Sequence, residues 1–286
     1  MVKTVVSLNF SMDILSSMTT VGRSGTSLTE AVRHFQARLW QALPLLGLGL
    51  LVGLALCWPG APFAQSVQNR VILVGDSTMA PHNGYGNDLC QRLGAETECW
   101  NLAKNGRSSK SFREEGLWAD TLSKLQSSPG VKAQWLLIQF GHNDQPGKPG
   151  RSTLLETEYP ANLERYVLEA REAGLTPVLV TPLIRRSFKD GQHIDDLAPW
   201  AHSVKNVADK LNIQVIDLHA SSRQKVREVG SAKADRYAVS PPGTPSFDRT
   251  HLGPLGACVF AAQVAAELPR VTQDQLRPQK SPPCDG

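Results

Sequence analysis

The sequence lacks an excess of charge of either sign. Its 30 Lys and Arg residues stand against 26 Asp and Glu residues, which leaves a formal net charge of +4. This balance gives no support to a nucleic-acid-binding protein, which would carry clustered basic residues. Hydrophobic residues make up 41% of the 286 residues, and 23 Gly and 19 Pro are spread along the chain. The composition therefore excludes collagen-like, coiled-coil and wholly disordered proteins.

Long apolar runs are also missing. The run LLGLGLLVGLALC, at residues 45–57, is shorter than the roughly 20 apolar residues that a membrane span requires. Two arginines precede this run and small, turn-forming residues follow it, an order typical of a secretory signal peptide. We expect cleavage near Ala64, which divides the chain into a leader at residues 1–64 and a single domain at residues 65–286. The alternative is an uncleaved leader that anchors a structural protein to a membrane.

Cysteine is scarce, with five residues in the whole chain. Cys57 falls in the expected leader, and an even number of four remains, which in an exported chain suggests two disulfides. Four cysteines allow three pairings. We expect Cys90–Cys99, because a helix joined to the next strand by a short connection can bring the two Cβ atoms close enough. We expect Cys258–Cys284 because it would tie the polar tail to the last helix.

Short apolar runs alternate with helical patterns along the expected domain. Most of the runs are continuous, as in strands buried on both faces of a parallel sheet; they occupy residues 71–74, 98–102, 135–140, 177–180 and 213–218. Apolar residues recur with helical spacing within residues 117–125, 160–173, 200–211 and 255–268. This alternation predicts an α/β fold, a three-layer sandwich with a five-stranded parallel sheet in flavodoxin-like order.

Polar residues follow the predicted strands, at the edge where open parallel sheets bind their ligands. Ser77 comes after the first strand, and its hydroxyl needs a base before it can act as a nucleophile. His251 is the candidate base, and Asp248 can accept a hydrogen bond from its other ring nitrogen and fix the tautomer. Three further donors could stabilise a developing oxyanion: the backbone N–H groups of Ser77 and Gly106, and the side-chain amide of Asn143.

Each of these segments also has an ordinary structural interpretation. Asn143 and Asp144 are turn-forming residues, and Gly-Asp-Ser after a strand is a common turn. A rival pair, Asp217 and His219, follows the fifth strand, but its spacing would point the two side chains apart if the strand continues, so we interpret Asp217 as structural. His142 and Asp144 make a poor zinc site and no HExxH motif occurs, so we expect no metal.

Four segments together resemble the four blocks of the SGNH (GDSL-like) hydrolases: Gly-Asp-Ser at 75–77, Gly106, Gly-His-Asn-Asp at 141–144 and Asp-Arg-Thr-His at 248–251. Within that superfamily, the segments GDSTM, NGRSSKSF, FGHND and TPLIRRSF resemble the rhamnogalacturonan acetylesterases. The resemblance covers essentially the whole expected domain, and the GxSxG elbow of the α/β-hydrolases is absent around Ser77.

The resemblance implies an exported, cofactor-free enzyme that removes acetyl groups from pectic rhamnogalacturonan. Its catalytic residues would be Ser77, Asp248 and His251, and its oxyanion hole would comprise Ser77, Gly106 and Asn143. The implied partner is an acetylated polysaccharide or oligosaccharide. We further expect a monomer that is secreted or periplasmic after signal cleavage and then binds neither nucleic acid nor membrane.

Substrate contacts are less defined. His142 lies within one of the matching blocks, and Arg185 and Arg186 follow the fourth strand, where cations could meet galacturonate carboxylates. The alternative is that the two arginines are solvated charges or structural ion pairs. Two other functions stay open: an SGNH esterase or lipase acting on another acyl ester such as acetylxylan, and a non-catalytic carbohydrate-binding protein on the same fold.

Overall fold

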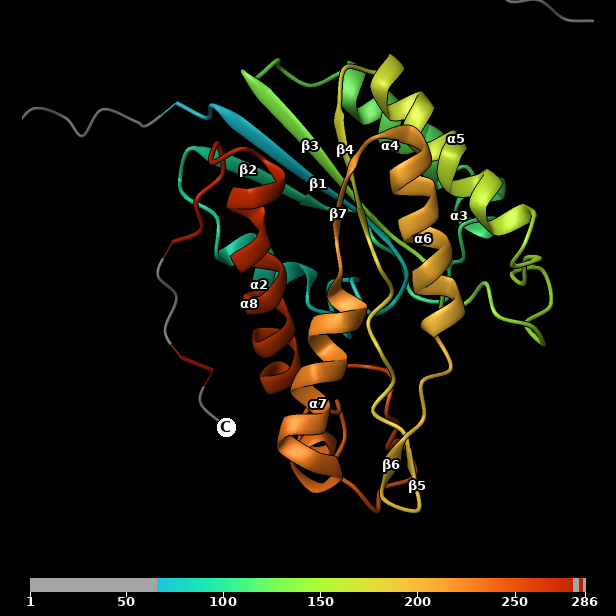
Figure 1. The fold of residues 1–286 in the computed structure, drawn as a ribbon. Coiled ribbons are helices and arrows are strands. Elements are labelled where there is room, and N and C mark those ends of the chain that lie inside the picture. Colours follow the sequence, from blue (N-terminus) through green and yellow to red (C-terminus); the bar gives the residue numbers. More distant parts are fainter. Residues whose placement is uncertain (1–65, 280–282, 285–286) are drawn as a thin grey trace, which may run out of the picture. The chain divides into compact units, whose positions relative to one another are not determined.

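The computed structural model describes residues 66–279 and 283–284. The expected leader, with its signal peptide and cleavage near Ala64, lies outside the described residues. The described chain is built around a five-stranded parallel sheet in the order β2-β1-β3-β4-β7 (Figure 1). The strands are β1 (Asn69–Gly75), β2 (Thr97–Asn101), β3 (Ala133–Gln139), β4 (Thr176–Val180) and β7 (Gln214–Ile216).

The central strands are apolar without interruption because both of their faces are buried. Along β1, Val71 and Leu73 pack into one hydrophobic cluster, while Ile72 and Val74 pack into a second cluster on the opposite face. Strand β3 pairs with β1 along its whole length, from Ala133 to Gln139. A strand between two helical layers gains from an apolar residue at every position, which explains why the pattern is continuous instead of alternating.

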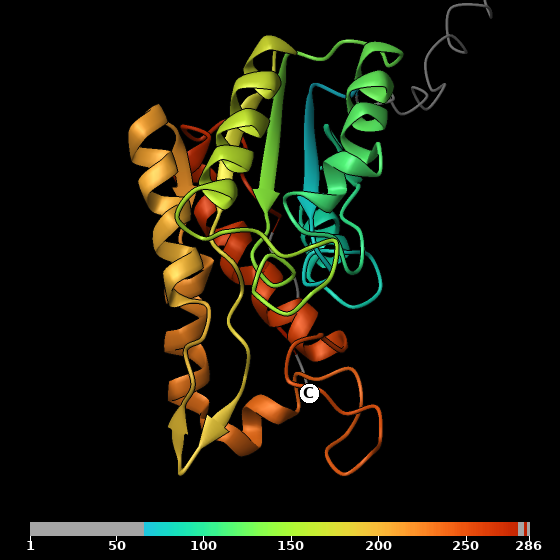
Figure 2. The same ribbon diagram turned by 90° about the vertical axis from the view of Figure 1, so that its right-hand side faces the viewer.

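Helices cover both faces of the sheet (Figures 1 and 2). One layer holds α2 (Gly86–Gln91), α7 (Leu218–Asp235) and α8 (Pro254–Val271), and the other holds α3 (Ser111–Glu114), α4 (Leu117–Gln126), α5 (Glu158–Glu172) and α6 (Ala198–Leu211). The predicted three-layer α/β fold, with its five parallel strands and flavodoxin-like order, is confirmed. Among the described residues, no helix has both the length and the apolar character needed to cross a membrane.

Helix α7 and a short β-hairpin were not predicted. Helix α7 directly follows β7 because Asp217 ends the strand: its carboxylate accepts a hydrogen bond from the backbone N–H of Ala220, 3.1 Å away, and so caps the helix. The predicted fifth strand, residues 213–218, is therefore too long at its C-terminal end. The second element is a short antiparallel hairpin of β5 (Phe188–Lys189) and β6 (Gln192–His193), too short to leave a strand pattern in the sequence.

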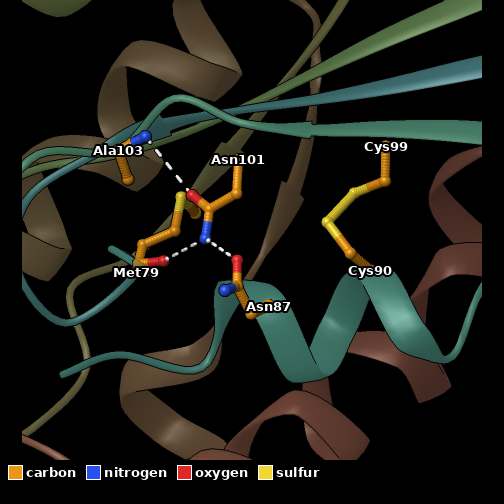
Figure 3. Close-up of a disulfide and its surroundings, with 6 residues drawn as sticks. All are labelled: Met79, Asn87, Cys90, Cys99, Asn101 and Ala103. Carbon is orange, nitrogen blue, oxygen red and sulfur yellow. Dashed lines mark hydrogen bonds between the residues drawn. A yellow bond between two sulfur atoms is a disulfide. The ribbon is translucent and has the colours of Figure 1, made fainter. Parts of the chain in front are cut away.

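The two disulfides join the pairs expected from the sequence. Cys90 in α2 bonds to Cys99 in β2, with Cα atoms 5.5 Å apart (Figure 3). Cys258 in α8 bonds to Cys284 in the tail, with Cα atoms 5.7 Å apart. The first bond fixes the edge strand β2 to the helix that precedes it, close to the end of the strand that leads towards Gly106.

Candidate active site

Ser77 lies in a tight turn at the carboxyl end of β1. The strand ends at Gly75, where a Cβ atom would come within 2.6 Å of the carbonyl oxygen of Gln139 on β3, so the close approach of the two strands requires glycine. The turn then closes through the carbonyl of Asp76, which accepts hydrogen bonds from the N–H groups of Met79 (3.2 Å) and Ala80 (3.1 Å). This geometry fixes the backbone on both sides of Ser77.

The structure brings Ser77, His251 and Asp248 into one chain of contacts. His251 Nε2 lies 2.9 Å from Ser77 Oγ, and its Nδ1 lies 3.2 Å from Asp248 Oδ2. The other carboxylate oxygen of Asp248 accepts the backbone N–H groups of Thr250 (2.8 Å) and His251 (2.7 Å). The local turn that holds Asp248 therefore also sets the orientation of the imidazole.

The environment of Asp248 favours its ionised form. Burial raises the pKa of this carboxyl, but hydrogen bonds from the backbone of His251 and Thr250 and from the His251 ring outweigh burial, so the pKa lies below its ordinary value. An ionised Asp248 accepts the Nδ1–H of His251. This tautomer leaves Nε2 free to accept the proton of the Ser77 hydroxyl.

The three candidate oxyanion donors differ in the partners that the structure gives them. The backbone N–H groups of Ser77 and Gly106 make no hydrogen bond with other residues that the structure describes. Gly106 has a φ of +76°, a conformation that glycine adopts without strain. Asn143 is buried and donates one amide hydrogen to the carbonyl of Arg107, at 3.1 Å, which leaves its second amide hydrogen for a ligand.

Arg151 links two of these donor-bearing residues, and the sequence analysis did not single it out. Its Nη1 donates to the carbonyl of Gly106 and to Oδ1 of Asn143, both at 3.3 Å. The second contact sets the amide of Asn143 so that its oxygen faces the arginine and its nitrogen faces Arg107. Arg151 lies in a polar loop with no regular spacing, so no sequence pattern indicates its role.

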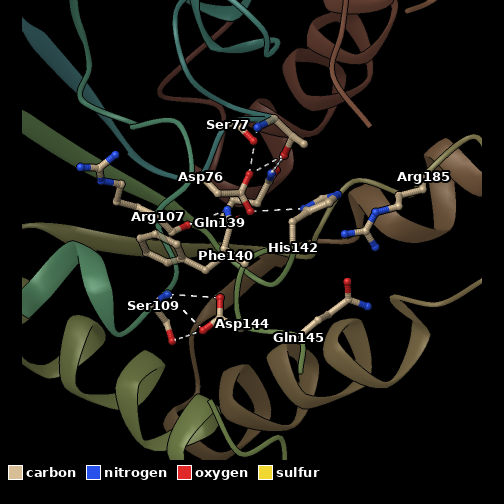
Figure 4. A network of polar contacts seen from close by, with 12 residues as sticks. Asp76, Ser77, Arg107, Ser109, Gln139, Phe140, His142, Asp144, Gln145 and Arg185 are labelled. Carbon is tan, nitrogen blue, oxygen red and sulfur yellow. Dashed lines mark hydrogen bonds and ion pairs between the residues drawn. The ribbon is translucent and has the colours of Figure 1, made fainter. Parts of the chain in front are cut away.

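His142 does not contact the open site, which corrects its expected role as a substrate contact. The side chain is 2% exposed, and its Nδ1 lies 3.2 Å from Oδ2 of the equally buried Asp76 (Figure 4). Burial lowers the pKa of His142 despite the opposing effect of Asp76. Burial alone would raise the pKa of Asp76, but the contacts with His142 and Thr78 outweigh burial and lower this pKa. The pair therefore holds a carboxylate on Asp76 and a neutral imidazole on His142.

Arg186 is also corrected, because its side chain is completely buried. It donates from Nη2 to the carbonyl of His251 at 2.7 Å and from Nη1 to that of Thr250 at 3.3 Å. Burial lowers its pKa to about 10, which still leaves it charged at neutral pH. Arg186 thus holds the segment that carries His251. Arg185 points the other way, where it is 17% exposed and pairs with Asp196.

Asp217 and His219, the rival pair, each contact other residues and not one another. Asp217 caps α7 and also accepts hydrogen bonds from Thr181 Oγ1 (3.0 Å) and Lys205 Nζ (3.2 Å). His219 is buried and its Nε2 lies 2.7 Å from Asp195 Oδ1. Both side chains therefore have structural partners. Within residues 66–279 and 283–284, no group of three or more His, Cys, Asp or Glu side chains is placed to hold a metal ion.

Comparison with known proteins gives concordant matches. The model of the GDSL-like Lipase/Acylhydrolase family matches residues 73–257. The chain is 34% identical over 204 residues to "Probable rhamnogalacturonan acetylesterase YesY" of Bacillus subtilis, covering 69% of this chain and 91% of the relative. It is 33% identical over 211 residues to "Rhamnogalacturonan acetylesterase RhgT" of the same organism, covering 68% and 88%.

A solved structure shares the fold. Protein YxiM of Bacillus subtilis superposes with a TM-score of 0.59 at 22% sequence identity, over 71% of this chain. The match covers 57% of the YxiM chain, so this chain spans little more than half of that protein's length.

Proposed function

The chain belongs to the GDSL-like lipase/acylhydrolase family and is most like its rhamnogalacturonan acetylesterases; from this premise we propose that it removes acetyl groups from pectic rhamnogalacturonan through an acyl-enzyme on Ser77. Membership makes it a carboxylic-ester hydrolase. The observation that carries the proposed mechanism is the continuous contact from Ser77 Oγ through His251 to Asp248. The names of the two curated relatives support the proposed substrate.

The contacts support the following sequence of steps. His251 Nε2 takes the proton of the Ser77 hydroxyl as Oγ attacks the acetyl carbonyl, and a tetrahedral intermediate forms. Its oxyanion accepts hydrogen bonds from the N–H groups of Ser77 and Gly106 and from the Asn143 amide. Asp248 stabilises the imidazolium, which then gives its proton to the departing sugar oxygen.

The acetyl group now forms an ester with Ser77, and a water molecule takes the place of the sugar. His251 removes a proton from this water as its oxygen attacks the acetyl carbonyl, and the same donors stabilise the second oxyanion. Collapse of this intermediate breaks the bond to Ser77 Oγ, which recovers its proton from His251. Acetic acid leaves and loses its proton to the solvent to give acetate, and the enzyme returns to its starting state.

An exported, single-domain enzyme fits this activity. Both disulfides join cysteines of the region proposed as the mature domain, residues 65–286, and such bonds persist in oxidising compartments. A polymer such as rhamnogalacturonan would be met outside the cytoplasm. We therefore propose a secreted or periplasmic monomer.

The proposal is tested by acetate release from acetylated rhamnogalacturonan, acetylated xylan and p-nitrophenyl acetate, measured side by side with the purified domain. We expect the highest kcat/KM on rhamnogalacturonan. The Ser77→Ala variant should lose about four powers of ten or more of kcat on every substrate while it keeps the wild-type thermal melt, because only the oxyanion donors and binding remain. Activity within tenfold of wild type in folded Ser77→Ala would remove Ser77 from the mechanism, and a preference for xylan would overturn the proposed substrate.

A further inference from the structure

A cavity of about 470 Å³ lies beside the loop that carries Gly106. Its lining comes from the loop after β1 at residues 80–82, from the end of β2 and the segment after it at residues 101–107, from Phe112 of α3, and from one side of α4. We propose that this cavity binds a uronic acid residue of the polysaccharide, with Lys104 as the cation that meets the sugar carboxylate. This inference rests on the proposed function and assigns a subsite to it.

Two of the segments that line the cavity also carry residues of the candidate active site. The loop after β1 contains Ser77 and reaches the cavity at Ala80, and the segment after β2 lines the cavity on both sides of Gly106, at Asn105 and Arg107. We therefore infer that a sugar in the cavity belongs to the same substrate chain as the acetyl ester bound at Ser77.

The two loops are tied together, so the cavity is already formed without a ligand. Asn101, at the end of β2, donates from Nδ2 to the carbonyl of Met79 at 3.1 Å and accepts the N–H of Ala103 at 3.3 Å (Figure 3). The Cys90–Cys99 disulfide lies two residues before Asn101 and anchors the same strand. A pre-formed pocket spares the substrate the cost of ordering these loops on binding.

The lining combines apolar and polar groups as sugar-binding pockets require. Its apolar side chains, Pro81, Leu102, Phe112 and Leu117, offer surfaces for the C–H faces of a pyranose ring. Asn105 and Asp120 supply polar groups that can bind hydroxyls. The volume falls within the range of about 300–1,000 Å³ that is common for small-molecule sites.

Lys104 is the cation of the lining that is available for a ligand. Arg107 is engaged by Glu115, with Nε 2.8 Å from the carboxylate, and Lys124 Nζ stacks 4.3 Å from the centre of the Trp100 ring. The Lys104 side chain is exposed and makes no hydrogen bond or ion pair with any residue that the structure describes. The exposed His82 imidazole is equally free of such contacts, whereas Asp120 is the acidic group of the lining.

Arg185, which the sequence suggested as a cation for galacturonate, is already paired with Asp196. Arg113, a cation that follows the Gly106 loop, likewise donates to Glu169 at 2.6 Å. A carboxylate arriving at either would have to displace a protein carboxylate. At Lys104 it would displace only water, so Lys104 is the better partner for a substrate carboxylate.

The test compares Lys104→Met and Lys104→Glu with wild type on three substrates: acetylated rhamnogalacturonan oligosaccharides, the same oligosaccharides with their uronates methyl-esterified, and p-nitrophenyl acetate. Lys132→Met is the matched control, since Lys132 is an exposed lysine just before the amino end of β3, whereas Lys104 follows the carboxyl end of β2. The substitution to Met should raise KM for the free-acid oligosaccharide about 2- to 5-fold, as expected for one exposed ion pair. The substitution to Glu should raise it about 5- to 20-fold, because repulsion replaces attraction.

Neither variant should change kcat/KM for the methyl-esterified oligosaccharide or p-nitrophenyl acetate by more than about twofold. The wild-type KM for the free acid should also rise with added salt, and this dependence should weaken in Lys104→Met. Equal effects on all three substrates, or no effect on any, would contradict the proposed uronate subsite without contradicting the proposed esterase activity. A wild-type enzyme that releases no acetate from any substrate would instead overturn the proposed function.

Discussion

The side-chain amide of Asn143 is held at both ends. Its oxygen accepts from Arg151 and its nitrogen donates to Arg107, so the remaining amide hydrogen has a fixed direction. A donor fixed before the reaction needs no reorganisation as charge develops on the substrate oxygen. This arrangement supports the proposed role of Asn143 as a donor to the transition state.

Replacing Asn143 should therefore act on the transition state more than on binding. We expect Asn143→Ala to lower kcat about 10²–10³-fold, or roughly 2.7–4 kcal/mol, with little change in KM. Asn143→Asp should be worse still, because it places a carboxylate beside the oxyanion. Steady-state kinetics with thermal melts of both variants measures this. An Asn143→Asp enzyme nearly as active as wild type would leave the residue with a turn-forming role only.

Arg151 should act through Asn143 and Gly106. We expect Arg151→Met to lower kcat about 5- to 30-fold, since it removes contacts worth about 1–2 kcal/mol, while KM changes little. The same change made in an Asn143→Ala background should cost clearly less, because part of what Arg151 positions is already gone.

Arg227→Met provides the control for this comparison. The side chain of Arg227 is exposed on α7 and makes no hydrogen bond or ion pair within the described chain, so its replacement should leave kcat unchanged. Full additivity of Arg151→Met and Asn143→Ala, in proteins with normal melts, would show that Arg151 does not work through the amide.

At the scale of elements, the two disulfides close loops of different length. Cys90 and Cys99 are 9 residues apart, whereas Cys258 and Cys284 are 26 residues apart. A longer closed loop removes more conformational freedom from the unfolded chain. The paired Cys→Ser substitutions should thus cost about 2.5 kcal/mol for the first bond and about 3.5 kcal/mol for the second.

Urea unfolding of the two double variants gives these free energies, and a non-reducing peptide map confirms the pairing in each. Wild type under reducing conditions should lose stability, while a variant lacking both bonds should not respond to the reductant. A larger loss for the Cys90–Cys99 variant than for the Cys258–Cys284 variant would contradict the loop-length argument.

Elements with a strong apolar pattern were predictable from the sequence, and those without it were not. The central strands β1, β3 and β4 are buried on both faces, and α5 and α6 carry clear apolar stripes, so the positions of these elements follow from hydrophobicity alone. Helix α7 buries few of its residues and contains Gly230 with a φ of +74° at a kink, so its sequence looks like a polar loop. Its start depends on the Asp217 cap, a contact that hydrophobic periodicity does not reveal.

In the candidate site too, some residues could be predicted from the sequence and others could not. Ser77 and Asn143 follow buried strands and could be placed at one sheet edge in advance. Arg151 reaches Asn143 because its loop folds back on itself, with Ser152 Oγ donating to the carbonyl of Gln145 at 2.8 Å. Arg185 and Arg186 are neighbours in the sequence, but Arg185 is partly exposed and Arg186 is buried. Residue type alone cannot predict this difference.

At the scale of the whole molecule, Asp144 should make stability depend on pH. Burial raises its pKa from 3.8 to about 7, although it accepts hydrogen bonds from Ser109, with Oγ at 2.5 Å, and from Thr153 (Figure 4). Between about pH 4 and pH 7 the folded chain therefore holds a proton on this carboxyl that the unfolded chain has lost. The contribution of Asp144 to the free energy of unfolding is complete below pH 4 and is lost as the pH rises to 7.

Comparison with Asp144→Asn isolates this contribution, because the amide does not titrate. The stability of wild type relative to the variant should fall by a few kcal/mol between about pH 4 and pH 7 and then level off. Denaturant unfolding across this range supplies the measurement. A difference that stays constant, or that grows in favour of wild type as the pH rises, would mean that the Asp144 carboxyl is ionised in the folded protein throughout.

The contact between Ser77 and His251 joins points 174 residues apart in the sequence. The His251 segment is docked through the N–H of Leu252, which donates to the carbonyl of Asn83 at 2.8 Å, and through Arg186. A ribosome therefore releases the hydroxyl long before its candidate base. A chain whose His251 segment has not yet emerged, or has not yet docked, would lack the partner proposed to activate Ser77. Acetate release should then begin only after that segment has folded against the Ser77 turn.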